Sequence, residues 1–329
     1  MLVGLERRND QWGYRIPFGL QWMWPVPLLM IIPFAPESPW WLVRKGRIEA
    51  AEHSVRRLTT KSAQEAKNTV AMMLHTAEIE MELQAGASYL DCFKGTNLRR
   101  TEICCFVFVA NVAAGIYFAN SPTYFFEQAG VTASNTYKLS LGGSALGFIG
   151  TLLGSVLIAR YGRRPLFLAG MILLTILLLI IGFVSIGPTT TSASYAQVAM
   201  TLLWVFVFDT TIGTGAYTIS SEVSAVKLRV KTVSLAKNTH NISNIVGAVL
   251  EPYMINPTSW NWKGKTAFFW AGTSAVATLW TFFRLPETKD RSYEDLDILF
   301  SQKLSARKFA QAVVDPYAYI VSANVDEKE

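Results

Sequence analysis

Long apolar stretches without charged residues constrain this chain more than any other feature of its sequence. A helix needs about 20 mostly apolar residues to cross a bilayer. Seven stretches meet that length or come close to it: 16–36, 103–126, 139–159, 165–187, 195–221, 232–255 and 266–283. Charged residues make up only 16% of the chain, and they gather between these stretches. We therefore expect an all-α membrane protein with seven transmembrane helices.

Two of the stretches carry ionisable groups, which are costly inside a membrane and usually functional. Asp209 lies in 195–221. Lys237, His240 and Glu251 lie in 232–255. A helix on the bilayer surface is the alternative for 232–255, but residues 245–250 show no polar face.

The polar segment that follows the first stretch has apolar residues at helical spacing. They form two sets, Ile48, Ala51, Val55 and Leu58, and Ala66, Val70, Met73, Ala77 and Met81. This spacing predicts short amphipathic helices. Lys and Arg concentrate in this segment, in the turns after the third and fifth stretches, and after the seventh. By the positive-inside rule, the loop 37–100 and the tail 286–329 are expected to be cytoplasmic.

The positive-inside rule also explains the net charge of +6, because the basic residues flank the apolar stretches. No nucleic-acid partner is therefore expected. The N-terminal residues do not form a signal peptide. Cys92, Cys104 and Cys105 lack metal or disulfide spacing. Since no P-loop or nucleophile elbow occurs, we expect no cofactor, metal or enzymatic activity. The glycines of 141–150 are typical of close helix packing.

A short triplet repeats across the chain. Pro-Glu-Ser at 36–38 follows the first stretch, and Pro-Glu-Thr at 286–288 follows the seventh. Many transporters consist of two parallel six-helix halves, although a match this short also arises by chance. The repeat predicts that 1–36 ends a first half, 37–100 is a loop, 101–285 forms a second half and 286–329 is a tail.

Several motifs resemble the sugar-porter family of the major facilitator superfamily. They are PESPWWL at 36–42, GRRPL at 162–166, SEVSAVKLR at 221–229 and PETKDRSYEDLD at 286–297. The segments IPFGLQWMWPVPL, TYFFEQAG and PYMINPTSWNWKGKTAFFWAG resemble the fungal maltose or general α-glucoside permeases within it. The chain departs from the family pattern at Ala159, Thr214 and Ser224.

The resemblance implies a truncated transporter fold that covers helices six to twelve of twelve. It implies proton-coupled uptake of an α-glucoside such as maltose by alternating access, in a multi-pass protein of the plasma membrane. The partners would be a small-molecule sugar, protons and the lipid bilayer. Two alternatives stay open. The chain is an inactive fragment or incomplete gene model of such a permease, or it is a sugar sensor without transport.

A sugar needs partners that donate and accept hydrogen bonds, and an aromatic platform. By position in the family motifs, the resemblance assigns substrate binding to Asn111, Tyr117, Tyr217, His240 and Asn241. Hydrogen bonds between helices, or ordinary packing, are the alternative explanation for each of them.

Charged residues at the expected cytoplasmic ends resemble the family's gate network of ion pairs. They are Glu37, Arg160, Arg163, Arg164, Glu222, Arg229 and Glu287. The alternative is that these charges only set the orientation of the helices in the membrane. Asp209 is either a proton site, since burial favours the protonated carboxyl, or a structural hydrogen-bonding group.

Overall fold

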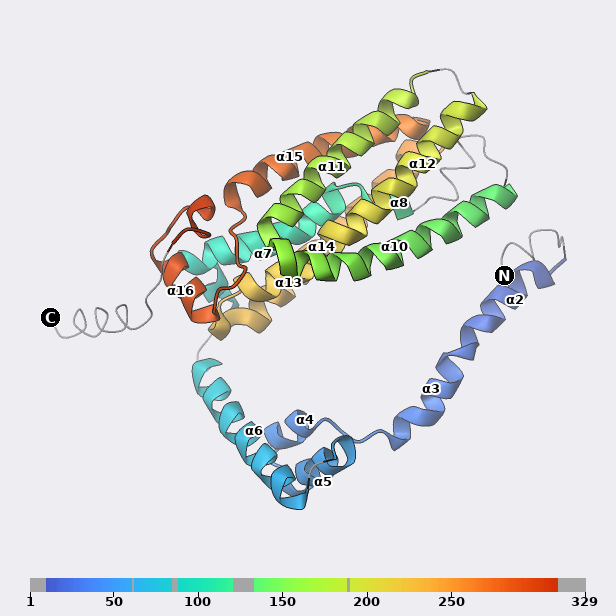
Figure 1. Cartoon of the computed structure of the whole chain (residues 1–329). Helices are drawn as coiled ribbons and strands as arrows, with labels where there is room; N and C mark the ends of the chain where they lie inside the picture. Colours follow the sequence, from blue (N-terminus) through green and yellow to red (C-terminus); the bar gives the residue numbers. More distant parts are fainter. Residues whose placement is uncertain (1–9, 61, 85–87, 121–132, 188–189, 313–329) are drawn as a thin grey trace. The chain divides into compact units, whose positions relative to one another are not determined.

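The structure, a computed structural model, describes residues 10–60, 62–84, 88–120, 133–187 and 190–312 (Figure 1). Within these ranges the regular elements are all helices. The chain divides into two compact units, Met1–Ala87 and Ser88–Glu329. The predicted segments 1–36 and most of 37–100 fall in the first unit, and the predicted helical half and tail fall in the second.

The first unit begins with an apolar rod that changes helix type three times. It runs through α2 (Trp12–Leu20), η1 (Gln21–Met23), α3 (Pro25–Ile31) and η2 (Ile32–Phe34). Proline lacks an amide hydrogen and crowds the preceding turn, and two of the changes fall at prolines: α3 begins at Pro25, and Pro33 lies in η2. The rod is long and apolar enough to span a membrane, and none of its residues is buried within the structure.

The rest of the first unit is a small three-helix cluster, α4 (Pro39–Arg44), α5 (Ile48–Leu58) and α6 (Ala63–Gln84). Its buried residues are Leu42, Val43, Ala51, Val55, Ala66, Val70 and Ala77. The predicted helical spacing therefore identified most of this core. Leu58 is the exception, because its side chain is 56% exposed; the side chain of Met81 lies outside the described set.

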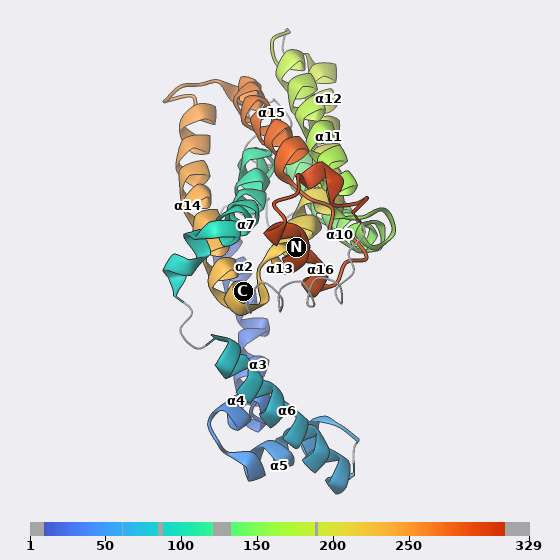
Figure 2. The ribbon, with the colours of Figure 1, turned by 90° about the vertical axis from the view of Figure 1, so that its left-hand side faces the viewer.

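The second unit is a bundle of long helices (Figures 1 and 2). Its main helical elements, in chain order, are α7 (Gly95–Ala113), α8 (Ile116–Asn120), α10 (Ala133–Tyr161), α11 (Arg163–Val184), α12 (Thr191–Phe208), η4 (Asp209–Gly213), α13 (Thr214–Val223), α14 (Arg229–Ile255) and α15 (Thr266–Arg284). Shorter helices are η3 (Tyr89–Phe93), η5 (Val226–Leu228), η6 (Lys263–Lys265), α16 (Tyr293–Ser301) and η7 (Ala306–Lys308). Helix α7 packs on α14 and α13, and α11 packs on α15 and α12.

Each of the seven predicted spans is mostly helical where it is described, although residues 121–126 lie outside the described ranges and 35–36 and 185–187 are not helical. Length and composition alone qualify four stretches as membrane spans: Trp12–Phe34, Lys138–Tyr161, Arg163–Val184 and Thr191–Val223. The predicted spans 103–126, 232–255 and 266–283 do not meet these criteria of length and composition. Helix α14 carries Lys237, His240 and Glu251, and the α7–α8 helix is interrupted at Gly115, where φ is +93°.

Glycines on α10 allow a close helix contact, as the sequence predicted. A Cβ on Gly150 would lie 2.9 Å from the carbonyl oxygen of Phe206, and one on Gly154 would lie 2.5 Å from that of Thr210. This approach holds α10 against the π-helical turn η4. The turn places Asp209 beside α10, and it separates α12 from the segment that carries Tyr217.

Candidate functional site

A polar and aromatic cluster forms where α7, α13 and α14 meet. The Lys237 ammonium donates a hydrogen bond to the Tyr217 hydroxyl at 3.1 Å. It also lies 4.7 Å from the centre of the Tyr217 ring and 5.0 Å from that of Phe108. Cation–π attraction of this kind helps to hold the ammonium over the two rings. Lys237 makes no ion pair among the described residues, so the cluster has a positive charge.

Phe108 lies at the centre of this cluster. Its ring meets that of Tyr217 edge-on at 5.2 Å, and its centroid is 5.2 Å from that of His240. The carbonyl oxygen of Phe108 and Nδ1 of His240 are 3.2 Å apart, which fits a hydrogen bond from a protonated Nδ1. The ring of Tyr217 is 57% exposed, so the cluster presents an open aromatic surface beside a cation and an imidazole.

Of the predicted substrate-binding residues, Tyr217 and His240 both contact the ring of Phe108. Asn111 is buried on α7, one turn after Phe108, and Asn241 is exposed on α14 one turn after Lys237. The ring of Tyr117 packs on α14, since a Cβ on Gly247 would lie 2.5 Å from Tyr117 Cδ2.

Sequence reasoning did not assign Phe108 or Lys237 to the site. Lys237 was noted as a charge inside an apolar stretch, and its spacing of three residues from His240 offered a signal, because residues i and i+3 share a helix face. Phe108 offered no signal, since it stands in a run of other apolar residues.

A second set of charges ties together α11, α13 and the segment after α15. Arg163 binds Glu222 with two nitrogens, at 3.0 Å from Nε to Oε2 and 2.7 Å from the terminal nitrogen to Oε1. The Thr288 hydroxyl donates to Glu222 Oε2 at 2.6 Å. Glu287 accepts bonds from the backbone amides of Arg163 at 3.0 Å and Arg164 at 3.1 Å. It therefore caps the positive end of α11.

The other predicted members of this network lie differently. Arg229 stacks on the ring of Tyr293 at 4.0 Å, and two of its nitrogens are buried without a hydrogen bond to any described residue. Arg160 takes part through its carbonyl oxygen, which accepts from Lys289 Nζ at 2.8 Å. Glu37 belongs to the first unit, where its carbonyl oxygen accepts a bond from Ser54.

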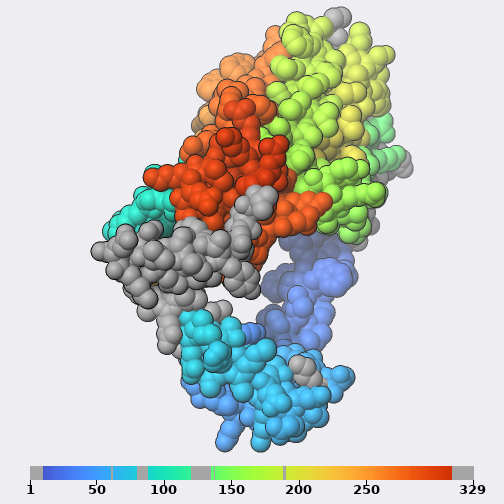
Figure 3. All heavy atoms as spheres, turned by 60° about the vertical axis from the view of Figure 1, so that its left-hand side comes forward, coloured from blue at the N-terminus to red at the C-terminus, as the bar shows by residue number. Residues whose placement is uncertain are grey.

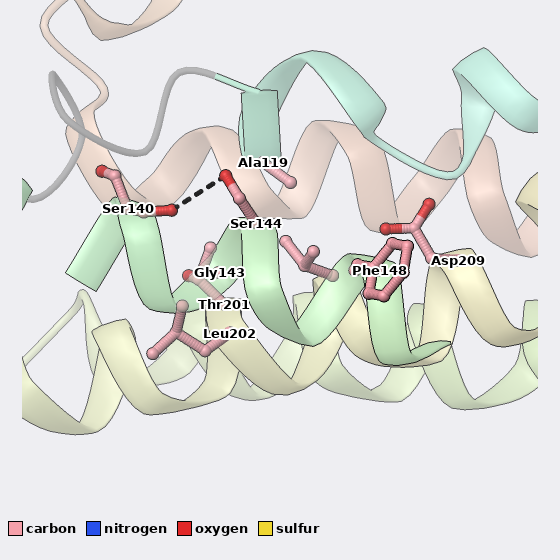
Figure 4. A pocket seen from close by; sticks show the side chains of 10 residues that line it. Ala119, Ser140, Gly143, Ser144, Phe148, Thr201, Leu202 and Asp209 are labelled. Carbon is pink, nitrogen blue, oxygen red and sulfur yellow. Dashed lines mark hydrogen bonds between the residues drawn. The ribbon is translucent and has the colours of Figure 1, made fainter. Parts of the chain in front are cut away.

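Asp209 lines a cavity of about 390 Å³ between α10 and α12, closed on one side by Ala119 of α8 (Figure 4). Ser140, Ser144 and Thr201 add hydroxyl groups to its wall. The Asp209 carboxylate makes no hydrogen bond or ion pair with a described residue. Asp209 is thus a carboxylate within a candidate membrane span, and it faces the cavity.

Glu251 on α14 is a second carboxylate inside the bundle, and only 2% of it is exposed. Its Oε2 accepts a hydrogen bond from the Trp270 indole at 2.6 Å, whereas Oε1 is buried with no partner among the described residues. In the same ranges, no group of His, Cys, Asp and Glu side chains has the arrangement of a metal site.

Comparison with known proteins gives a consistent result. The family model for sugar and other transporters matches residues 2–300. A general alpha-glucoside permease of Saccharomyces cerevisiae is 38% identical over 314 residues, which cover 94% of this chain and 51% of the permease. A maltose permease of the same species is 36% identical over 315 residues, again 94% and 51% of the two chains. The chain therefore spans about half the length of these curated relatives.

The fold also matches solved structures. The proton:xylose symporter XylE, a protein of the major facilitator superfamily bound to 6-bromo-6-deoxy-D-glucose, superposes with a TM-score of 0.67 at 21% identity. The match covers 91% of this chain and 62% of the symporter. A partially occluded inward-open structure of XylE from E. coli superposes with a TM-score of 0.65. The arrangement of helices is therefore that of the major facilitator superfamily.

Proposed function

Because this chain belongs to the family of sugar and other transporters, we propose that it takes part in carbohydrate transport across a membrane by alternating access. The proposed substrate is an α-glucoside such as maltose. This assignment is supported by the relatives named as general alpha-glucoside and maltose permeases. The proposed location is the plasma membrane, with the loop 37–100 and the tail on the cytoplasmic side.

The cluster at α7, α13 and α14 carries the proposal. Sugars bind to sites that combine an aromatic face with groups that donate and accept hydrogen bonds. Tyr217 offers the exposed ring, and Lys237 and His240 offer donors beside it. Asn111 on α7, Tyr117 on α8 and Asn241 on α14 are the other proposed substrate-binding residues, and Asn111 is buried in the described conformation.

We assign the network of Arg163, Glu222 and Glu287 to a cytoplasmic gate. Its bonds join three segments that are distant in sequence, and several charges that share partners can bias a two-state equilibrium. Arg164 and Arg160 support it through main-chain groups. Arg229 and Glu37 contact other groups, so their proposed roles are peripheral in the described conformation.

Asp209 is the proposed proton site. A carboxylate at membrane depth that faces a cavity and lacks a partner among the described residues is a natural proton acceptor. Asp209→Asn would then make sugar uptake insensitive to external pH in a transport assay. An unchanged pH profile would exclude this role and leave sugar transport itself untouched.

The substrate assignment is tested by measuring maltose binding to the purified full chain in nanodiscs by isothermal titration calorimetry. Tyr217→Ala should weaken maltose binding about tenfold, because loss of an aromatic platform and its hydroxyl removes about 1–2 kcal/mol. Tyr253→Ala is the matched control, since Tyr253 is similarly exposed on α14 but lies outside the cluster.

Uptake of radiolabelled maltose by cells that lack α-glucoside permeases extends the test to transport. Wild-type binding with uptake supports the proposal. Binding without uptake would favour a sensor or a non-transporting fragment. An absence of maltose binding to the wild-type chain would remove the α-glucoside assignment.

A further inference from the structure

A cationic cavity lies at the end of the bundle where α7 begins and α15 ends. Its volume is about 480 Å³, and three basic side chains line it, Arg99, Arg284 and Lys303. The first residues of α7, Gly95 and Thr96, also contribute to the wall. The N-terminus of this 19-residue helix adds partial positive charge.

Two of the basic groups are fixed in position. The Arg99 guanidinium lies 5.4 Å from the centre of the Phe300 ring and donates a hydrogen bond to the carbonyl oxygen of Leu304. Its Nε is buried without a partner among the described residues. Arg284 binds Glu102, with 3.1 Å between Nε and Oε1. Burial and then the positive charge of Arg284 lower the pKa of Arg99.

Lys303 has an unusual backbone. Its φ is +54°, just after α16 ends, at a position that glycine or asparagine normally fills. Its ammonium makes no hydrogen bond or ion pair with a described residue. The acidic group next to the cavity is Glu102, which is already bound to Arg284. The cavity therefore keeps an excess of positive charge.

An apolar groove of about 400 Å³ shares helix α15 with the cationic cavity. It lies between α11 and α15 and is lined by residues such as Ile172, Leu279 and Phe282. The ring of Phe282 contacts that of Phe283, which lines the cationic cavity, with 5.1 Å between centroids. In Figure 3 the tail (red) lies on the surface beside the yellow-green atoms of α11.

We propose that the cavity and the groove together bind one anionic phospholipid. Its phosphate would lie among Arg99, Arg284 and Lys303, because guanidinium and ammonium groups with helix N-terminal amides match phosphate oxygens. An acyl chain would lie along the groove between α11 and α15. A free phosphate ion would make the same contacts with the basic side chains, but it has no acyl chain to occupy the apolar groove. Basic pockets at the ends of membrane helices bind lipid headgroups in this way.

The test measures phosphatidylserine binding to the purified full chain by native mass spectrometry, with phosphatidylcholine as the reference lipid. Wild type should bind phosphatidylserine more tightly. Lys303→Ala should weaken that binding about fivefold, and binding of phosphatidylcholine should not change. Lys308→Ala is the matched control, because Lys308 is exposed on the same tail but does not line the cavity. It should change binding less than twofold.

Competition with inorganic phosphate distinguishes the two sources of the headgroup. Phosphate at millimolar concentration should not displace the lipid. Equal wild-type binding of both lipids, equal effects of the two lysine variants, or full displacement by inorganic phosphate would each overturn the proposal. Both lysines are exposed, so neither variant should change folding, which a thermal unfolding scan checks.

Discussion

The bond between Glu251 and Trp270 shows how much depends on one donor inside an apolar bundle. Both side chains are almost completely buried, and the indole is the donor observed for the carboxylate among the described residues. Trp270→Phe removes that donor and leaves both carboxylate oxygens unsatisfied. We expect the free energy of unfolding to fall by about 1–3 kcal/mol, measured by chemical denaturation in micelles.

Trp280→Phe is the matched control for this prediction. Trp280 also lies on α15 and donates to a carboxylate, Glu102, at 3.2 Å. Glu102 keeps the Arg284 guanidinium after the substitution, so the loss should stay below about 1 kcal/mol. Equal losses in the two variants would mean that ring packing, and not the hydrogen bond, sets the stability at Trp270.

Candidate site residues could be proposed from the sequence only where the family resemblance marks their positions. It led to Tyr217 and His240, which both contact Phe108, while their role in substrate binding stays a prediction. The partners Phe108 and Trp270 could not be predicted, because contacts across helices depend on how each helix is rotated about its axis. Spacing within a single helix contains no such information.

At the scale of elements, the bonds of Glu222 join α13 to α11 and to the segment after α15. Glu222→Gln keeps the shape but removes the charge that faces Arg163, whose side chain is only 20% exposed. Leaving this guanidinium without a carboxylate should lower the free energy of unfolding by about 1–3 kcal/mol. Thermal and denaturant unfolding of the purified chain measure the loss.

Glu294→Gln provides the comparison, because Glu294 is exposed on α16 and should change stability by less than about 0.5 kcal/mol. A loss in Glu222→Gln no larger than this would indicate that the ion pair is solvated and does not hold the three segments together. The gate assigned to these residues would then lack its physical basis.

The helices themselves were predictable, but their interruptions were not. Apolar length predicted where the long helices lie, since a segment that crosses a bilayer must be long and apolar, and four of the seven stretches also qualify as candidate spans by length and composition in the structure. At the break at Gly115, where φ is +93°, Trp270 packs so closely that a Cβ placed there would lie 3.1 Å from the Trp270 Cβ. The π-helical turn at Asp209–Gly213 likewise faces the glycines of α10. Both interruptions depend on neighbours far away in the sequence.

At the scale of the whole molecule, the hydrophobic cores of the two units are separate. The first uses residues between Leu42 and Ala77, and the second uses residues between Ile103 and Phe309. The match to the superfamily fold, and the family motifs on which the resemblance was based, extend across both units. Sequence similarity therefore identified the architecture, whereas this division into two cores required the structure.

Separate cores predict separate folding. We expect residues 88–329, expressed without 1–87, to keep the main unfolding transition of the full chain, because the large second core is complete within them. Circular dichroism during heating in micelles measures this transition. Leu178→Ala, at a fully buried position of that core, should lower stability by about 2–5 kcal/mol in both the shortened and the full chain. If the shortened chain instead unfolds without cooperativity, the second core depends on residues 1–87, and the two units fold as one.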